Sequence, residues 1–427
     1  MDELSIRGDE PMSTGRTIAL WAFICRPQAG SELGVGWNWA QAYARSGHDV
    51  HLVTMPTFRE ELEEQLSTQT APGRVTVHFT RADDGVYARG HRGRLRFKLD
   101  YLQWQKEALR VSRRAGLDAA DLGHHVSLGS ILPGTRLDQL GPPLIFGPAG
   151  GGHLTGHELQ EYLGRSFRES IRTITVKRLS RRLPSARRTA SRSHLLLVGN
   201  PPSEMLARQL GARHVERMLP EGTDESLLAP EVRRSQNSRE QLVLWVGRFL
   251  PIKGAPLAVE AFDHVRRAVP TARLVMVGDG VTQAETQRRA RALGLSESVE
   301  FTGKLDWPSV MRLYDQADVL MLTSIRDSST ATGMEAATRG LPIVALSHSG
   351  GGGCDDYPDL GVTKVTAMPV TSVAERFGQA VTEVLNDEDY QQRSKVMLEF
   401  AADNTWDAKV ARLSRWFAQL GSSRVRC

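Results

Sequence analysis

Cysteine is scarce in this chain and its spacing forms no framework. The 427 residues include three cysteines, Cys25, Cys354 and Cys427, which lie far apart and form no CxxC pair. An odd number of widely spaced cysteines argues against a disulfide scaffold and against a thiolate zinc site. The composition therefore favours a reducing compartment, and we expect the protein in the cytoplasm.

Long apolar runs are also missing. The first apolar run, from Ile18 to Cys25, is too short to cross a bilayer and is better interpreted as a buried strand. The N-terminus, Met1-Asp2-Glu3, is acidic, whereas a secretory signal begins with basic residues. The chain is 40% hydrophobic and 24% charged, which is ordinary for a globular protein, and its length suffices for two or three domains.

The signatures of several enzyme classes are absent. No GxGxxG followed by an acid about twenty residues later occurs, which argues against an NAD-dependent dehydrogenase. The loop from Arg26 to Trp37 is rich in glycine but lacks the GKS or GKT of a Walker loop. No HxxxH pair with a glutamate is present, so we predict no metal site. We expect no bound cofactor either.

Acidic residues are outnumbered, which gives a net charge of +5 and a pI near 9.2. Much of the excess lies in two segments, Arg89 to Arg114 and Arg165 to Arg192. We favour their interpretation as solvated helix faces, with an anionic membrane surface or a negatively charged acceptor as the functional alternatives. Nucleic acid is a weaker candidate because no aromatic residues are interleaved with the charges.

Short apolar runs alternate with helical patterns along the chain, which is typical of parallel α/β sheets. In the first half the predicted strands are Thr17–Ile24, Asp49–Thr54, Val75–Thr80, Leu144–Phe146 and Leu195–Val198. In the second half they are Leu242–Val246, Arg273–Val277, Val299–Thr302, Val319–Leu322 and Ile343–Leu346. The helices that we predict are 34–45, 257–268, 282–293 and 308–316, with a last one at about 406–420.

The two series of strands predict two doubly wound domains. We place the first at residues 1–220 and the second at 221–403, with the last helix, within 404–427, packing back towards the first domain. Open α/β sheets bind ligands at the carboxyl ends of their strands. Two such domains that face each other would form a cleft between those edges.

The most informative segment lies between Asp327 and Glu335. These two acids are separated by Met334 and by six small residues, Ser328, Ser329, Thr330, Ala331, Thr332 and Gly333. A predicted strand precedes the segment, and a second follows it after Gly340-Leu341-Pro342. Small residues let backbone N–H groups approach an anion, and a helix start favours negative charge. The segment therefore suits a ligand with a phosphate centre and hydroxyl-rich ends, such as a nucleotide sugar.

Two cations stand in the same predicted sheet. Arg248 follows the strand 242–246 and Gly247, and Lys253 follows five residues later. Arginine offers a planar fork and lysine a point charge, so the pair can neutralise two phosphates. A solvent-facing basic loop is the alternative. The phosphate interpretation is favoured because Arg248 and Lys253 belong to the same predicted sheet as the acidic segment.

Glycines and histidines at other strand ends support more than one interpretation. Gly34 lies in the glycine-rich loop that could cradle a diphosphate from the opposite wall, or form an ordinary turn. Gly303 could let a nucleoside base lie against backbone, or serve a tight turn. The run Gly350 to Gly353 suggests a ligand-facing loop. A single histidine, such as His125, is more often structural than catalytic.

Taken together, these pieces resemble the retaining glycosyltransferases of family 4, which have the GT-B fold of two Rossmann-like domains. The resemblance spans nearly the whole chain and includes the family's E-x7-E signature, here in a branch with an RDSGG-like loop. Its motifs are GSELGVGWNWAQAYARSGHDVHLVT, the pair Trp104-Gln105, GPAGGGH at 147–153, EGTD at 221–224, VGRFLPIKG at 246–254 and SIRDSSTATGMEAATRGLPIVAL at 324–346.

The resemblance implies a role for particular residues. Arg248 and Lys253 would hold the donor diphosphate, Glu335 would accept hydrogen bonds from the ribose hydroxyls, and Asp327 would contact the transferred sugar. Further implied contacts to the donor involve Gly34, Gly247, Gly303 and the amides of Ser328, Ser329 and Thr330. His125 matches a histidine that lies near the sugar.

The chain departs from the family pattern in three ways. Asp327 replaces the commoner glutamate, Ser329 and Thr330 replace glycines, and His153 stands where relatives often carry an acid. The aspartate at 327 is typical of the RDSGG-like branch. Ser329 and Thr330 would crowd the loop, and His153 leaves the acceptor contacts open.

The function that we predict is metal-independent transfer of a hexosyl-type sugar from a nucleotide diphosphate donor to an acceptor hydroxyl, with retention of configuration. The acceptor could be a small molecule, a lipid-linked sugar or a saccharide. Two alternatives stay open: a GT-B nucleotide-sugar epimerase, which needs no acceptor, and a non-catalytic nucleotide-sugar-binding protein. Ser329, Thr330 and His153 would support the last of these.

Overall fold

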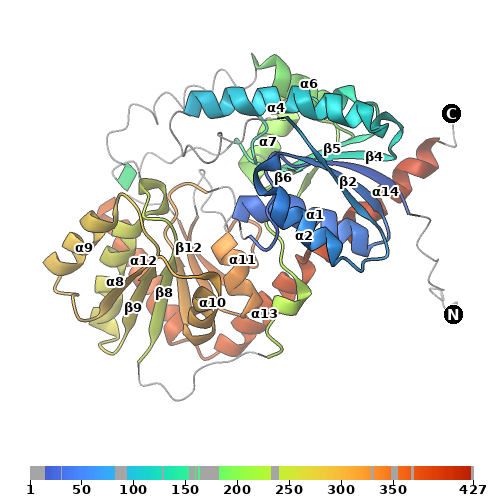
Figure 1. Cartoon of the computed structure of the whole chain (residues 1–427). Coiled ribbons are helices and arrows are strands. Elements are labelled where there is room, and N and C mark those ends of the chain that lie inside the picture. The colour runs from blue at the N-terminus through green and yellow to red at the C-terminus, as the bar shows by residue number, and fades with distance from the viewer. Residues whose placement is uncertain are drawn as a thin grey trace, which may run out of the picture.

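The computed structural model describes residues 15–29, 31–81, 94–126, 129–152, 159, 162–163, 182–231, 240–327, 331–347, 354–366 and 370–424. These residues form two lobes, each built on a parallel sheet with helices on both faces (Figure 1). The α/β class and the GT-B arrangement that we predicted are confirmed.

The first lobe contains a seven-stranded sheet with the order β3-β2-β1-β4-β5-β6-β7, in which all pairs are parallel. Its strands are β1 (Thr17–Trp21), β2 (Asp49–Thr54), β3 (Val75–Phe79), β4 (Leu122–His125), β5 (Leu144–Ala149), β6 (Leu195–Val198) and β7 (Val215–Arg217). Its helices are α1 (Ser31–Arg45), α2 (Arg59–Ser67), α4 (Arg94–Arg114), α6 (Pro184–Arg192) and α7 (Pro201–Gln209).

Strand β1 shows how this sheet buries both faces. Ile18 and Leu20 lie in a core with α1, whereas Ala19 and Trp21 lie in a separate core with α4. Successive side chains of a strand point to opposite faces, so a strand covered on both sides needs a continuous apolar run. The sequence TIALW provides that run.

The second lobe contains a six-stranded parallel sheet with the order β10-β9-β8-β11-β12-β13. Its strands are β8 (Leu242–Val246), β9 (Arg273–Val277), β10 (Val299–Gly303), β11 (Val319–Leu322), β12 (Ile343–Ser347) and β13 (Val362–Thr366). Its helices are α8 (Ala255–Ala268), α9 (Gln283–Ala292), α10 (Trp307–Gln316), α11 (Ala331–Thr338), α12 (Val370–Leu385) and α13 (Tyr390–Asp403).

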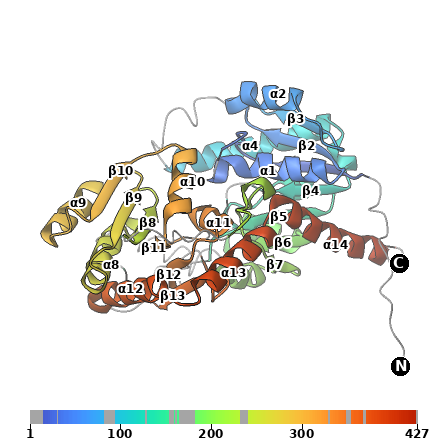
Figure 2. The ribbon, with the colours of Figure 1, turned by 90° about the horizontal axis from the view of Figure 1, so that it is seen from below.

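The segment that leads from β7 to the second lobe and the segment that returns from α13 lie side by side. Thr223 and Thr405 form an isolated parallel bridge, and the Trp406 N–H donates to the Thr223 carbonyl at 3.0 Å. Helix α14 (Trp406–Arg424) then continues to the first lobe (Figure 2). There Trp406 and Val410 belong to the same core as α1.

A short piece of the first half packs on the second lobe. Leu159 is buried in the core formed by α8 and α12, with Tyr162 and Leu163 against it. The Tyr162 hydroxyl also donates to Glu260 of α8. These contacts differ from our assignment of residues 1–220 to the first domain alone.

Helix α1 also differs from the prediction, because it begins at Ser31 rather than at 34. Gly34 and Gly36 therefore lie inside a helix and not in a loop. A Cβ on Gly36 would lie 2.4 Å from Ala22 Cβ, and one on Gly34 would lie 1.9 Å from the Ala29 carbonyl oxygen. Close packing of α1 on β1 and the preceding turn accounts for both glycines.

Candidate functional site

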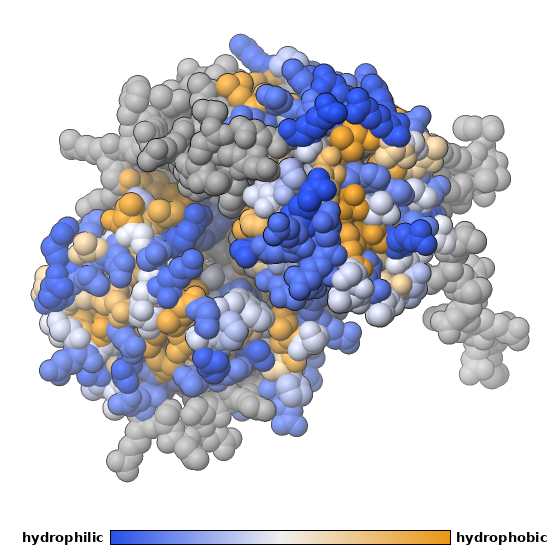
Figure 3. All heavy atoms as spheres, viewed as in Figure 1, coloured by the Kyte–Doolittle hydropathy of each residue, from blue (hydrophilic) through white to orange (hydrophobic). Residues whose placement is uncertain are grey.

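Two of the residues that we predicted to bind the donor, Lys253 and Asp327, meet beyond the ends of β8 and β11. These strands are neighbours and parallel, so the loops that follow them leave the sheet at the same edge. In the space-filling view the surface is hollowed where the two lobes meet (Figure 3). This edge is the place at which open α/β sheets bind ligands.

Thr323 connects the two loops through hydrogen bonds. Its hydroxyl accepts a hydrogen bond from the Trp245 indole at 3.0 Å and contacts the carbonyl oxygens of Lys253 and Gly254, each at 3.0 Å. The Ile325 N–H donates to the Ile252 carbonyl at 2.8 Å. The backbone next to Lys253 is therefore fixed by the segment that follows β11.

Gly254 makes this close approach possible. Its φ is +65°, and a Cβ there would lie 2.2 Å from the Thr323 carbonyl oxygen. Any side chain at this position would strain the turn and push the loops apart.

Lys253 and Asp327 form an ion pair across these loops, with side chains that are 22% and 18% exposed. The Ser324 hydroxyl lies 3.5 Å from the same carboxylate oxygen of Asp327. The structure thus brings together Lys253, which we predicted to bind the phosphates, and Asp327, which we predicted to contact the sugar. Their partial exposure leaves both open to a ligand.

Arg248 lies just beyond the end of β8, in the loop that also contains Lys253. Its side chain is exposed, and it forms no ion pair within the part of the chain that the structure describes. Gly247, which precedes it, has room above the Trp245 ring, since a Cβ there would lie 3.4 Å from that ring. A guanidinium that is exposed in this way can fork onto an incoming phosphate.

Glu335 lies on α11 and is held by two aromatic side chains of α10. The Trp307 indole N–H donates to Oε1 at 3.2 Å, and the Tyr314 hydroxyl donates to Oε2 at 3.1 Å. Burial raises the pKa of Glu335 above its ordinary value, while the two donors lower it and the nearby Glu221 raises it. A carboxylate has about four acceptor positions, so two remain for other donors.

Glu32 brings an acid from the first lobe to the same place. Its side chain is open to solvent, yet the surrounding protein raises its pKa, while a hydrogen bond from the Gly129 backbone and the charge of Arg248 lower it. The electrostatic effect of Arg248 relates this first turn of α1 to the end of β8. The start of α1 in the first lobe is therefore near the end of β8 in the second.

His125 lies deeper than the other predicted residues. It is fully buried at the end of β4 and contacts the Tyr101 hydroxyl at 3.0 Å and the Thr135 hydroxyl at 2.6 Å. Burial is the main cause that lowers the pKa of His125 to about 3, and the charge of His124 contributes to this decrease. The imidazole is neutral, and direct contact with a sugar would require its neighbours to move.

Gly303 ends β10 with a φ of +71°, and no heavy atom lies within 4 Å of the position that its Cβ would take. Open space at a glycine fits both predictions, a ligand approach and a tight turn. Ser328, Ser329, Thr330, His153 and the run from Gly350 to Gly353 lie outside the described residues.

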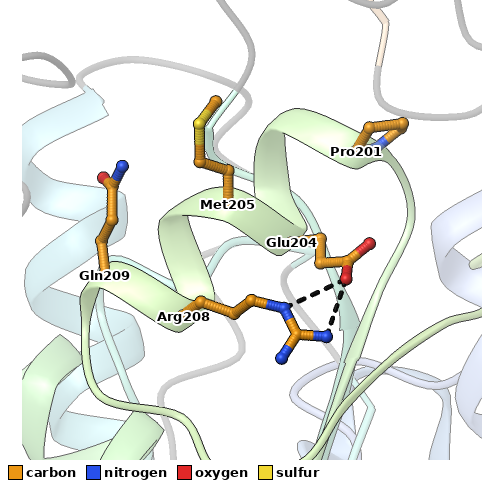
Figure 4. A pocket seen from close by; sticks show the side chains of 5 residues that line it. All are labelled: Pro201, Glu204, Met205, Arg208 and Gln209. Carbon is orange, nitrogen blue, oxygen red and sulfur yellow. Dashed lines mark hydrogen bonds and ion pairs between the residues drawn. The ribbon is translucent and has the colours of Figure 1, made fainter.

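A separate hollow of about 430 Å³ lies beside α7 in the first lobe (Figure 4). Its lining comes from this one helix: Pro201, Glu204, Met205, Arg208 and Gln209. Arg208 and Glu204 pair with each other at 2.9 Å, so their charges are already satisfied. The hollow does not bring together groups from several elements as the Lys253–Asp327 region does, and we assign it no role.

Sequence reasoning did not single out Glu32, Trp307 or Tyr314. The spacing between Trp307 and Tyr314 places both on one face of a helix, but nothing local indicates that this face meets Glu335. Among the described residues there is no cluster of three or more potential metal ligands. None of the described helices is both long and apolar enough to cross a membrane.

Comparison with known proteins supports the class of protein that this site indicates. Residues 230–396, which include Arg248, Lys253, Asp327 and Glu335, match the family model described as "Glycosyl transferases group 1". This region covers the second lobe as far as the first half of α13. The E-x7-E assignment to family 4 in particular stays a prediction.

The individual relatives have low sequence identity to this chain. Mannosylfructose-phosphate synthase from Agrobacterium fabrum is 23% identical over 269 residues, which cover 58% of each chain. The aligned regions span 32%, 58% and 40% of three curated relatives, so the match never reaches two thirds of their length.

Solved structures match over a longer part of the chain. Sucrose-phosphate synthase from Thermosynechococcus elongatus aligns with a TM-score of 0.63 and 18% identity, covering 96% of this chain and 100% of that one. Anabaena HepE in complex with UDP and glucose aligns with a TM-score of 0.58 and 16% identity, covering 96% and 100%. At these identities the likeness shows the fold.

Proposed function

We propose that this chain is a retaining glycosyltransferase that moves a hexosyl-type sugar from a nucleotide diphosphate donor to an acceptor hydroxyl. The observation that carries the proposal is the contact between Lys253 and Asp327, with exposed Arg248 and the held carboxylate of Glu335 on the same edge. Cations for a diphosphate and acids for hydroxyl groups are thereby collected in one place.

The charges of this site suit the bond that breaks. As the sugar leaves the diphosphate, negative charge grows on the leaving phosphate oxygens. Arg248 and Lys253 can stabilise that charge, and electrostatic stabilisation of the transition state is commonly the largest catalytic contribution. These fixed cations would do the work of a divalent metal, so we expect activity to survive chelation by EDTA.

The two acids have different roles in this proposal. Asp327 orients the sugar through its hydroxyl groups, and Glu335 holds the ribose. Neither acts as the acid or nucleophile of a glycosidase, because that chemistry needs two carboxyl groups on either side of the scissile bond. The acceptor oxygen attacks the anomeric carbon on the face that the phosphate leaves, and its proton passes to a leaving phosphate oxygen.

The experiment that tests the proposal compares Arg248→Ala with Arg291→Ala in the purified protein. Arg291 is exposed on α9, away from the end of β8, and serves as the matched control. Release of nucleoside diphosphate in the presence of donor and acceptor should fall about 100-fold or more for Arg248→Ala and stay unchanged for Arg291→Ala. Equal rates for both variants would refute the assignment.

Product analysis by NMR extends the same experiment. An α-linked donor should give an α-linked product, since we propose retention. A nucleotide sugar that is altered without any acceptor would instead indicate the epimerase, and binding without turnover would indicate a non-catalytic protein.

A further inference from the structure

Trp307 is a large side chain left partly open to solvent next to Glu335. It is 44% exposed, whereas Trp21, Trp39, Trp104 and Trp245 are almost completely buried. It is the first residue of α10, which begins beyond the end of β10. Leaving so much aromatic surface in water costs free energy that burial would recover, and a ligand that covers the ring would recover it.

The start of α10 fixes the position of this ring. The Asp306 carboxylate caps the helix by accepting from the Ser309 N–H at 3.0 Å, and Pro308 follows Trp307. The capping bond and the fixed φ of proline restrict the backbone on either side of Trp307. The ring is therefore presented from a rigid helix start.

The hydrogen bond to Glu335 restrains the ring further. Trp307 donates through Nε1 to Oε1 at 3.2 Å, which ties the nitrogen-bearing edge of the indole to the carboxylate. An indole has no other hydrogen-bond donor, so the faces of the ring interact through apolar contact and stacking. Tyr314, which is buried, holds the other oxygen of Glu335.

We propose that the face of Trp307 stacks on the base of the donor nucleotide while its indole N–H positions Glu335 for the ribose. The proposal rests on the proposed function, in which Glu335 accepts from the ribose hydroxyl groups. The base is bonded directly to that ribose, so a nucleotide held at Glu335 carries its base next to the adjoining indole. Aromatic stacking accepts any base, which makes Trp307 an anchor for affinity.

The experiment measures binding of UDP, ADP and GDP by calorimetry, together with inorganic pyrophosphate, which has neither base nor ribose. For the nucleotide that binds the parent protein most tightly, Trp307→Ala should weaken binding on the order of tenfold to a hundredfold. Pyrophosphate binding should stay within twofold, because its contacts are with Arg248 and Lys253. Trp307→Phe, which keeps a ring but no N–H, should bind the nucleotide more tightly than Trp307→Ala.

Two further measurements separate stacking from a structural effect. A base stacked on the indole should quench tryptophan fluorescence in the parent protein, and the quench should disappear in Trp307→Phe. Leu360→Ala, at a residue with a similar exposed fraction of 43%, is the control and should bind every probe as the parent does.

Unchanged nucleotide affinity in Trp307→Ala, or equal losses for nucleotide and pyrophosphate, would overturn the assignment of Trp307 while leaving the proposed function intact. A Trp307→Phe variant no better than Trp307→Ala would exclude stacking. Absence of nucleotide binding in the parent protein would overturn the proposed function and this inference together.

Discussion

Lys409 is a buried cation at the point where the chain returns to the first lobe, and its replacement by methionine should stabilise the protein at neutral and acidic pH. The side chain is 2% exposed, and Nζ donates to the Leu219 carbonyl at 2.7 Å. Burial lowers the pKa of Lys409 from 10.5 to about 7, with the nearby Glu221 raising it and Arg412 lowering it.

The direction in which stability changes with pH follows from proton binding in the folded and unfolded states. Between pH 7 and 10.5 the unfolded chain binds a proton at this lysine that the folded protein does not, so stability rises with pH across that range. Below pH 7 both states are protonated, and the folded state bears the full cost of a buried ammonium group. At about 1.4 kcal/mol for each pH unit, this cost is about 5 kcal/mol.

Lys409→Met removes that cost but leaves the Leu219 carbonyl without its donor, which costs about 1–3 kcal/mol. The variant should therefore be more stable than the parent by about 2–4 kcal/mol at pH 6. The advantage should shrink as pH rises and reverse between about pH 8 and 10, where the remaining cost of the buried lysine falls below the cost of the unpaired carbonyl.

The assay is chemical denaturation at pH 6, 8 and 10, followed by fluorescence and circular dichroism so that separate unfolding of the two lobes is detected. Lys395→Met is the control, because Lys395 is exposed on α13, and its change should stay within about 0.5 kcal/mol at each pH. A Lys409→Met variant that is destabilised at pH 6, or whose difference from the parent does not depend on pH, would refute the reasoning.

Two further predictions concern the donor site. Gly254→Ala would place a Cβ 2.2 Å from the Thr323 carbonyl oxygen at a φ of +65°, so it should displace Lys253. Pyrophosphate binding, measured by calorimetry, should weaken at least about tenfold. An unchanged affinity would show that Lys253 does not hold phosphate. Burial raises the pKa of Glu335, so the acid limb of the pH profile of kcat/KM should lie above the ordinary glutamate range. Glu335→Gln should flatten that limb, and an identical profile in both proteins would exclude Glu335 as its source.

The sequence predicts most strands of this fold because they are short apolar runs buried on both faces. The interval Leu242–Val246, for example, agrees with β8 at both ends. Strand β4 escaped prediction because half of its four residues are histidines, whose burial depends on the distant partners Tyr43 and Tyr101. The three-residue edge strand β7 is only partly buried, so its apolar pattern is weak.

The same difference between local and distant contacts decides which parts of the candidate site could be predicted from the sequence. Lys253 and Asp327 could be placed together from the sequence because both follow strands of one sheet, and parallel strands end at the same edge. Trp307 and Tyr314 could not, because their meeting with Glu335 depends on the packing of α10 against α11. A pattern within one helix shows which residues share a face, but it does not show what that face contacts.

The connection between the lobes links the donor site to Lys409 through one carboxylate. Glu221 raises the pKa of Glu335 and also that of Lys409, so its charge acts on the acid that we assign to the ribose and on the buried lysine of the crossing. A change in the charge of Glu221 must therefore alter proton binding at both places, in the same direction. Substitutions of Glu221 should for this reason be judged by donor binding and by stability together, since an effect on one alone would not fit the arrangement of these three groups.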